Sequence, residues 1–153
     1  MDPHAYRLSR CTDPSNAPQQ VHWAVMGETR VERELVTAVA PHVARAALPD
    51  VIAEIKAVLQ RIATCQAVDP DDIKNITRDR DLFEIRFQLE SFGLLVRIYT
   101  AEPEELPRHV IALRVHQKVV GVSDTETADL QNSEIDVASK RLALGRPTRW
   151  GLL

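Results

Sequence analysis

The stretch LFEIRFQLESFGLLVRIYTAEPEELPRHVIALRVHQK, residues 82–118, decides the fold. Apolar residues occupy every second position at its start, which is the period of a strand with one buried face. Two turn segments, Ser91-Phe92-Gly93 and the acidic Glu102–Pro107, divide the stretch into three strands. Consecutive strands joined by short turns pair side by side, so the stretch predicts a three-stranded antiparallel meander.

Helices are predicted before this meander. Leu48-Pro49-Asp50 starts a segment in which apolar residues recur at helical spacing, at Val51, Ile52, Ile55, Val58, Leu59 and Ile62. An earlier helix is expected from the T-x-x-E capping box at Thr29–Glu32 to about Ala40, where Pro41 breaks it. A short strand over Val21–Met26, ended by Gly27, is expected in front of that helix.

After the meander, the polar and aperiodic residues 121–132 predict a loop. A last helix is expected between Ser133 as N-cap and Gly145 as the C-terminal stop. This order predicts an α+β fold, in which N-terminal helices pack on a small antiparallel β-sheet with a C-terminal helix. The domain spans residues 21–145, between a flexible, proline-rich arm at 1–20 and a C-terminal tail at 146–153, because neither end has an apolar period.

The composition of the 153 residues, 44% hydrophobic and 27% charged, is that of one globular domain. No apolar run reaches the length of a membrane span and no secretory signal precedes the domain, so we expect a cytoplasmic protein without membrane partners. Two isolated cysteines, Cys11 and Cys65, indicate a reducing compartment without a disulfide framework or a structural zinc. The histidines His4, His22, His42 and His109 are scattered as well, so no metal is expected. Five glycines without a cluster form no phosphate loop, so no nucleotide or other small-molecule cofactor is expected.

The polar face of the meander is the candidate site. Alternation places Glu84, Arg86 and Gln88 on this face of the first strand, and Arg114, His116 and Lys118 on that of the third. The middle strand contributes Arg97 and Tyr99 between them. Cations that hold a phosphate, a proton acceptor and a proton donor are all available in the set Arg86, Arg97, Tyr99, His116 and Lys118. The alternative is an ordinary solvated sheet face of mixed charge.

Four sequence blocks on these elements resemble a known family. They are Leu82-Phe83-Glu84-Ile85-Arg86, Val96-Arg97-Ile98-Tyr99, Leu113–Lys118 and Glu134–Arg141, and in this order they resemble the blocks of phage-derived HigB-type toxins of the RelE/ParE superfamily. The resemblance covers roughly residues 21–144. It implies the toxin of a type II toxin–antitoxin system, a metal-independent endoribonuclease (mRNA interferase) that cleaves mRNA on the ribosome, inhibits translation and arrests growth.

The resemblance also implies roles for single residues. Arg86 and Arg97 match the family's two strand arginines and Lys118 matches the first lysine of a pair whose second member is here Val119. A ribose 2′-hydroxyl would attack the adjacent phosphorus, with the arginines holding phosphate oxygens, Lys118 as base or fixed charge, and His116 or Tyr99 as acid. Neighbouring basic residues expected to contact RNA are Arg114, Arg78 and Arg80.

The implied partner is a helix-turn-helix antitoxin of the HigA type that neutralises the toxin and represses its own operon. Val119, and His116 at a position where the family has an aromatic residue, depart from the family pattern. The sequence therefore also allows a non-catalytic or ParE-like protein-binding module of the same fold.

Overall fold

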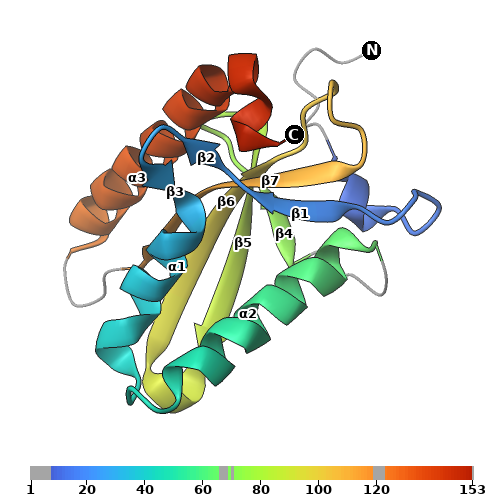
Figure 1. The fold of residues 1–153 in the computed structure, drawn as a ribbon. Coiled ribbons are helices and arrows are strands. Elements are labelled where there is room, and N and C mark those ends of the chain that lie inside the picture. The colour runs from blue at the N-terminus through green and yellow to red at the C-terminus, as the bar shows by residue number, and fades with distance from the viewer. Residues whose placement is uncertain (1–7, 66–68, 70, 119–122, 153) are drawn as a thin grey trace.

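The structure, a computed structural model, describes residues 8–65, 69, 71–118 and 123–152. It is an α+β fold built on a five-stranded mixed sheet with the strand order β1-β7-β6-β5-β4. Figure 1 shows α1 and α2 on one side of this sheet and α3 on the other. In chain order the elements are β1 (Gln20–Trp23), β2 (Val25–Met26), β3 (Thr29–Arg30), α1 (Val31–Val39), α2 (Leu48–Ala63), β4 (Ile73–Asn75), β5 (Leu82–Leu89), β6 (Leu94–Ala101), β7 (His109–Gln117) and α3 (Asp124–Gly145).

The meander predicted from residues 82–118 is confirmed, since β5, β6 and β7 pair antiparallel in sequence order. The sheet is larger than predicted. β4 adds an antiparallel strand beside β5, and β1 pairs parallel with β7 at the other end. The expectation of a wholly antiparallel sheet is therefore wrong at this edge. The hydrophobic period of a strand does not specify its partner, so the parallel pair could not be read from the sequence.

The second predicted helix is confirmed as α2, and its apolar stripe faces the core. Ile55 and Leu59 are each only 1% exposed, and Figure 1 shows the helix lying across the sheet. Ile85 of β5, on the apolar face of the meander, is equally buried. Matching apolar surfaces on the helix and on the sheet thus form the core of the protein.

The start of α1 differs from the prediction. Its N-cap is Arg30, whose side chain makes no capping hydrogen bond, and Thr29 instead lies in β3, where it pairs with Met26 of β2. The predicted capping box is therefore wrong. Glu32 forms an ion pair with Lys56 of α2 rather than reaching back to the helix N-terminus.

The loop predicted over residues 121–132 is wrong for the part that the structure describes, because α3 already begins at Asp124. Its N-cap is Ser123, whose hydroxyl accepts a hydrogen bond of 3.2 Å from the backbone N–H of Glu126. Ser133, the predicted N-cap, lies inside the helix. Residues 121 and 122 fall outside the described residues.

Both ends of the described chain pack into the core, contrary to the expectation that they lie outside it. Cys11, in a short 3-10 helix at Arg10–Thr12, is 1% exposed. Trp150, in another 3-10 segment at Arg146–Gly151, is fully buried. A single buried aromatic residue in an aperiodic tail leaves no pattern in the sequence, and its burial depends on the tertiary fold. None of the helices in the described part of the chain has the length and apolar character needed to cross a bilayer.

Candidate functional site

Three basic side chains form a row across the polar face of the sheet. Arg86 of β5 lies directly opposite Arg97 of β6, and Arg97 lies opposite His116 of β7. Directly opposed residues of antiparallel strands point to the same face, so the three side chains are neighbours. We call these residues the basic row. A second row beside it contains Glu84, Tyr99 and Arg114.

Most of the face that carries these rows is covered rather than solvated, although the Arg86 side chain stays 49% exposed. Tyr99 is fully buried, and Glu84 and Arg97 are 4% and 6% exposed. The cover is α3: the Gln131 amide donates to Glu84, and the Glu134 carboxylate accepts from Arg114. The prediction that the residues share one face is confirmed. The alternative of an ordinary sheet face open to water is wrong for this part of the sheet.

One carboxylate partly balances the two arginines of the basic row. Glu84 accepts a hydrogen bond from Arg86 Nε, and its Oε1 lies 3.7 Å from Arg97 Nε. The Nη1 atom of Arg97 is buried and has no hydrogen-bond partner among the described residues. Two guanidinium groups facing one carboxylate leave a local excess of positive charge, and part of that charge sits on an unsatisfied buried donor.

Lys118 follows the end of β7 and extends the positive charge beyond the row. Its backbone N–H donates to the Leu95 carbonyl at 2.9 Å, which fixes the chain beside β6. Lys118 lines a hollow of about 360 Å³ together with Arg86 and Arg97, and a smaller one of about 60 Å³ with Arg97, His116 and the first half of α3. The structure therefore gathers three cationic side chains around the larger hollow, which has room for a phosphate group.

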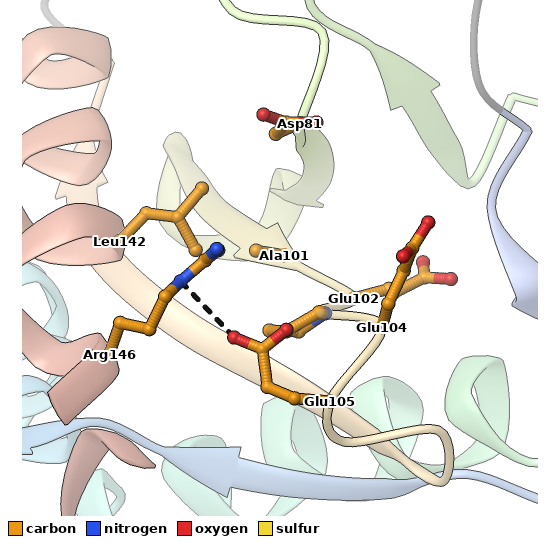
Figure 2. A pocket seen from close by; sticks show the side chains of 8 residues that line it. Asp81, Ala101, Glu102, Glu104, Glu105, Leu142 and Arg146 are labelled. Atoms are coloured by element: carbon orange, nitrogen blue, oxygen red, sulfur yellow. Dashed lines mark ion pairs between the residues drawn. The ribbon is translucent and has the colours of Figure 1, made fainter. Parts of the chain in front are cut away.

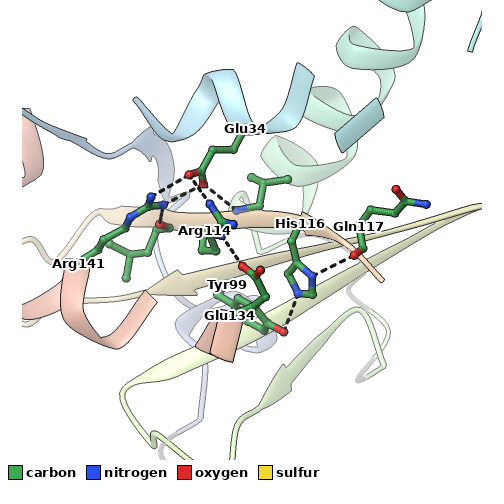
Figure 3. Close-up of polar contacts among 9 residues, drawn as sticks. Glu34, Tyr99, Arg114, His116, Gln117, Glu134 and Arg141 are labelled. Atoms are coloured by element: carbon green, nitrogen blue, oxygen red, sulfur yellow. Dashed lines mark hydrogen bonds and ion pairs between the residues drawn. The ribbon is translucent and has the colours of Figure 1, made fainter. Parts of the chain in front are cut away.

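Tyr99 and His116 form a hydrogen-bonded pair beneath α3. The Tyr99 hydroxyl lies 2.9 Å from His116 Nε2, and the Gln117 carbonyl lies 3.2 Å from His116 Nδ1 (Figure 3). A carbonyl only accepts, so these two contacts together assign the proton to Nδ1 and leave Nε2 to accept from Tyr99.

Burial disfavours the charged forms of both groups in this pair. Burial is the main cause that raises the pKa of Tyr99 to about 12, and the neighbouring Glu84 carboxylate adds to it. Burial also lowers the pKa of His116 below its ordinary value of 6.5, although Glu134 opposes the shift. At neutral pH the pair is thus a neutral tyrosine and a neutral imidazole, and the imidazole is the better proton acceptor.

The three basic residues expected to contact RNA occupy different environments. Arg114 is held between two carboxylates, Glu34 of α1 and Glu134 of α3, and Figure 3 shows it enclosed between these helices. This arginine therefore joins elements of the fold. Arg78 forms a bidentate ion pair with Asp136 of α3 but lines the same open hollow as Arg86. Arg80 is exposed on the connection between β4 and β5.

A separate acidic hollow of about 170 Å³ lies near the other end of β6 (Figure 2). Arg146 closes one side of it through an ion pair of 3.1 Å with Glu105. The buried carboxylate in its wall, Glu102, accepts from the Ser9 hydroxyl and from the Arg10 backbone N–H. Because these contacts hold the N-terminal segment in place, we assign this hollow a structural role.

Sequence reasoning found the basic row but missed the residues of α3 that cover it. Gln131 fell within the predicted loop, because the first turns of α3 are polar on every side and show no helical period. The S-x-x-E pattern at Ser123–Glu126 was the available signal of an earlier helix start. Within the described residues, no group of three or more histidine, cysteine or acidic side chains is arranged to hold a metal ion.

Comparisons with known proteins leave the family open. No family model matches the chain, and neither a curated protein nor a solved structure matches it. The function must therefore be argued from the site itself.

Proposed function

We propose that this chain is the toxin of a type II toxin–antitoxin system, a HigB-type member of the RelE/ParE superfamily that cleaves mRNA on the ribosome. The observation that carries the proposal is the basic row. Arg86 and Arg97 come from two of the sequence blocks that resemble the family, and they lie opposite each other in adjacent strands with Lys118 beside them. Arg97 Nη1, buried and unpartnered among the described residues, supplies a donor for a phosphate oxygen.

In this proposal the site acts by holding a phosphate and moving protons. The 2′-hydroxyl of one ribose attacks the adjacent phosphorus, and the bond from phosphorus to the 5′-oxygen of the next nucleotide breaks. Arg86 and Arg97 stabilise the negative charge that builds on the phosphate oxygens, and Lys118 adds a third cation. His116, which is neutral at pH 7, accepts the hydroxyl proton once the substrate displaces the Tyr99 hydroxyl from Nε2. The displaced Tyr99 hydroxyl donates a proton to the leaving 5′-oxygen as its bond to phosphorus breaks.

RNA reaches His116, which lies beneath α3, only if the first half of this helix moves aside. The buried residues of α3 are Ile135, Ala138, Leu142 and Gly145, all in its second half. The described residues before them bury no side chain, so little hydrophobic burial holds them against the sheet. A polar cover of this kind can open at a small cost in free energy while the second half of the helix stays in the core.

The proposed partners are mRNA on the ribosome and a HigA-type helix-turn-helix antitoxin in the cytoplasm. A small helix-turn-helix gene directly beside this one would support the pairing. Co-expression of its product should relieve growth arrest, because the antitoxin neutralises the toxin by binding it.

The test is induction of the chain in bacterial cells without the antitoxin. Growth and translation should stop, and new mRNA ends should map within codons. Arg97→Ala and Lys118→Ala should each slow cleavage by about 100-fold or more, the usual effect of removing a preorganised donor to a developing charge. The matched controls are Arg61→Ala and Lys56→Ala, which remove one arginine and one lysine side chain from α2, on the opposite side of the sheet. Both control variants should stay toxic.

Arg97 is buried, so its replacement can also destabilise the fold. Thermal unfolding of each variant therefore shows whether lost toxicity reflects lost catalysis or lost folding. Lys118→Arg is the finer variant, since it keeps the charge but replaces an ammonium that can release a proton by a guanidinium that does not. Toxicity that survives in folded Arg97→Ala and Lys118→Ala would contradict the catalytic assignment.

A non-catalytic or ParE-like protein-binding module is the second candidate, and the Glu84 contacts favour it. Glu84 neutralises part of the charge that an endonuclease needs, and the fully buried Tyr99 presents no hydroxyl to a substrate. Growth arrest with intact mRNA and with DNA damage caused by a poisoned topoisomerase would support this function over mRNA cleavage.

A further inference from the structure

The fold brings the two cysteines of the chain together, although the sequence reads them as isolated. Cys11 lies in the 3-10 helix at Arg10–Thr12, and Cys65 follows Thr64, the C-cap of α2. They are 1% and 2% exposed, and Cys65 Sγ lies 3.3 Å from the carbonyl oxygen of Arg10, the residue directly before Cys11. Both are free thiols in this structure.

The backbone conformation of Cys65 and a contact of its thiol position this residue against the segment that carries Cys11. Cys65 adopts a left-handed conformation, with φ of 61°, which turns the chain sharply at the end of α2. Its thiol donates to the Arg10 carbonyl, with a sulfur-to-oxygen distance of 3.3 Å, next to Cys11.

The segment that carries Cys11 is anchored equally firmly. The Arg10 guanidinium donates to the Leu106 carbonyl at 3.0 Å and to the Pro103 carbonyl at 2.7 Å. These contacts hold the 3-10 helix against the connection between β6 and β7. The pair is therefore a preorganised feature of the fold and not a chance approach of two mobile side chains.

We propose that Cys11 and Cys65 form a redox-sensitive disulfide that ties the N-terminal segment to the end of α2. The oxidant is a low-molecular-weight disulfide of the glutathione type. The proposal is independent of the function proposed above, since neither cysteine belongs to the basic row.

The chemistry is thiol–disulfide exchange in two steps. One protein thiolate attacks a sulfur of glutathione disulfide, which breaks the S–S bond, forms a mixed disulfide and releases one glutathione thiolate. The second protein thiolate attacks the protein sulfur of the mixed disulfide and releases the second glutathione. The protein loses two electrons and two protons, and glutathione disulfide is reduced to two glutathione thiols.

The environment of the thiols makes this exchange slow in the folded protein. Burial is the main cause that raises the pKa of Cys11 to about 12, with the nearby Glu102 carboxylate adding to it, and burial also raises the pKa of Cys65. Only the thiolate is a nucleophile, so the rate should rise about tenfold for each unit of pH over the range where the thiols stay protonated. Exchange also needs a brief local opening of the N-terminal segment, since glutathione does not fit between buried thiols.

The experiment incubates the reduced protein with glutathione disulfide between pH 7 and pH 9, followed by acid quenching and peptide mapping by mass spectrometry. A peptide that links Cys11 to Cys65 should appear, and the intact chain should lose two hydrogens without gaining glutathione. The crosslink closes a loop of more than 50 residues, so the oxidised protein should melt roughly 10 °C higher than the reduced protein. Dithiothreitol should reverse both changes.

Cys11→Ser and Cys65→Ser are the matched controls, and neither should show the rise in melting temperature on oxidation. Peptide mapping of the oxidised chain without substitutions tests the proposal even if a serine variant folds poorly. Two thiols that still react with a thiol reagent after oxidation and unfolding would overturn the proposal. Stable glutathione adducts or disulfide-linked dimers in place of the internal link would also overturn it.

Discussion

Replacing Gly145 by alanine tests how the C-terminal tail completes the core. Gly145 is the last residue of α3, with ordinary helical dihedral angles, and the indole of Trp150 lies against its Cα. A Cβ atom at position 145 would lie 2.1 Å from Trp150 Cδ1 and 2.6 Å from Nε1. Helix propensity alone predicts that alanine stabilises the helix, by up to about 1 kcal/mol. The geometry predicts the opposite sign.

The expected loss in the free energy of unfolding follows from the contacts that the Trp150 indole would lose. Trp150 has to retreat by about 1.3 Å to reach the 3.4 Å of an ordinary contact. Its Nε1 donates to the carbonyls of Arg141 and Leu142 at 3.1 and 3.2 Å, and the ring is fully buried, so the retreat disturbs both hydrogen bonds and the packing around it. Overpacking costs about 1–3 kcal/mol and each weakened hydrogen bond about 1 kcal/mol, which leaves a net loss of about 2–4 kcal/mol after the propensity gain.

Urea unfolding followed by circular dichroism measures this loss, with the slope against urea unchanged. Ala143→Gly, at an exposed position of the same helix, is the control that reports propensity alone and should cost about 1 kcal/mol. In a Trp150→Ala background the added methyl group meets no ring, so Gly145→Ala should there be neutral or slightly stabilising. An unchanged or higher stability of the single variant would refute the packing of Trp150 against Gly145.

Three further predictions concern buried or half-buried polar groups. The fold raises the pKa of Tyr99 from 10.0 to about 12, so the stability that its protonated form contributes is present below pH 10 and is lost as the pH rises towards 12. Urea unfolding at several pH values should show this alkaline loss, of about 3 kcal/mol, and Tyr99→Phe should remove it. Glu34→Gln should lower the free energy of unfolding by about 3 kcal/mol, because Arg114 and Arg141 lose the carboxylate that pairs with both. A loss below about 1 kcal/mol in urea unfolding would count against a structural role of these two ion pairs. Ser9→Ala should lower the free energy of unfolding by about 1–3 kcal/mol, because it removes the hydroxyl that donates to the buried Glu102 carboxylate at 2.5 Å. An unchanged thermal midpoint would show that this contact of the N-terminal segment does not stabilise the fold.

The parts of the fold that the sequence predicted are those with a strong hydrophobic period. The alternation from Phe83 to Leu89 and the helical stripe from Val51 to Ile62 both correspond to observed elements within one or a few residues. Alternation fails locally in β7. Between Tyr99 and Thr100 of β6 the pairing with β7 shifts by one residue, so that Leu113 of β7 is an extra residue without a partner in β6. A bulge of this kind changes which face the residues beyond it occupy, and single-strand alternation carries no sign of it.

The candidate site was predictable in its sheet residues and not in its cover. Arg86 and Arg97 share a face because the strand period and the short turn at residues 91–93 fix their register, and both features can be read from the chain. His116 lies opposite Arg97 only because the bulge at Leu113 shifts the pairing of β6 with β7 by one residue. The first half of α3 contacts the face through polar groups, and a helix that is polar on all sides has no apolar stripe to reveal it. The charge of the site therefore followed from the sequence, while its accessibility depended on tertiary contacts.

Arg97 connects the cover of the site with its proposed chemistry. A guanidinium that is 6% exposed, with one nitrogen lacking a partner among the described residues, costs the fold about 1–3 kcal/mol relative to a satisfied group. Glu84 does not meet this need, because its Oε1 lies 3.7 Å from Nε of Arg97 and accepts more closely from Arg86. An anion that enters when the first half of α3 moves aside would satisfy the nitrogen and neutralise the excess charge together. Displacing the weakly packed helix start and binding a phosphate are thus energetically coupled, which makes the covered face compatible with an RNA substrate.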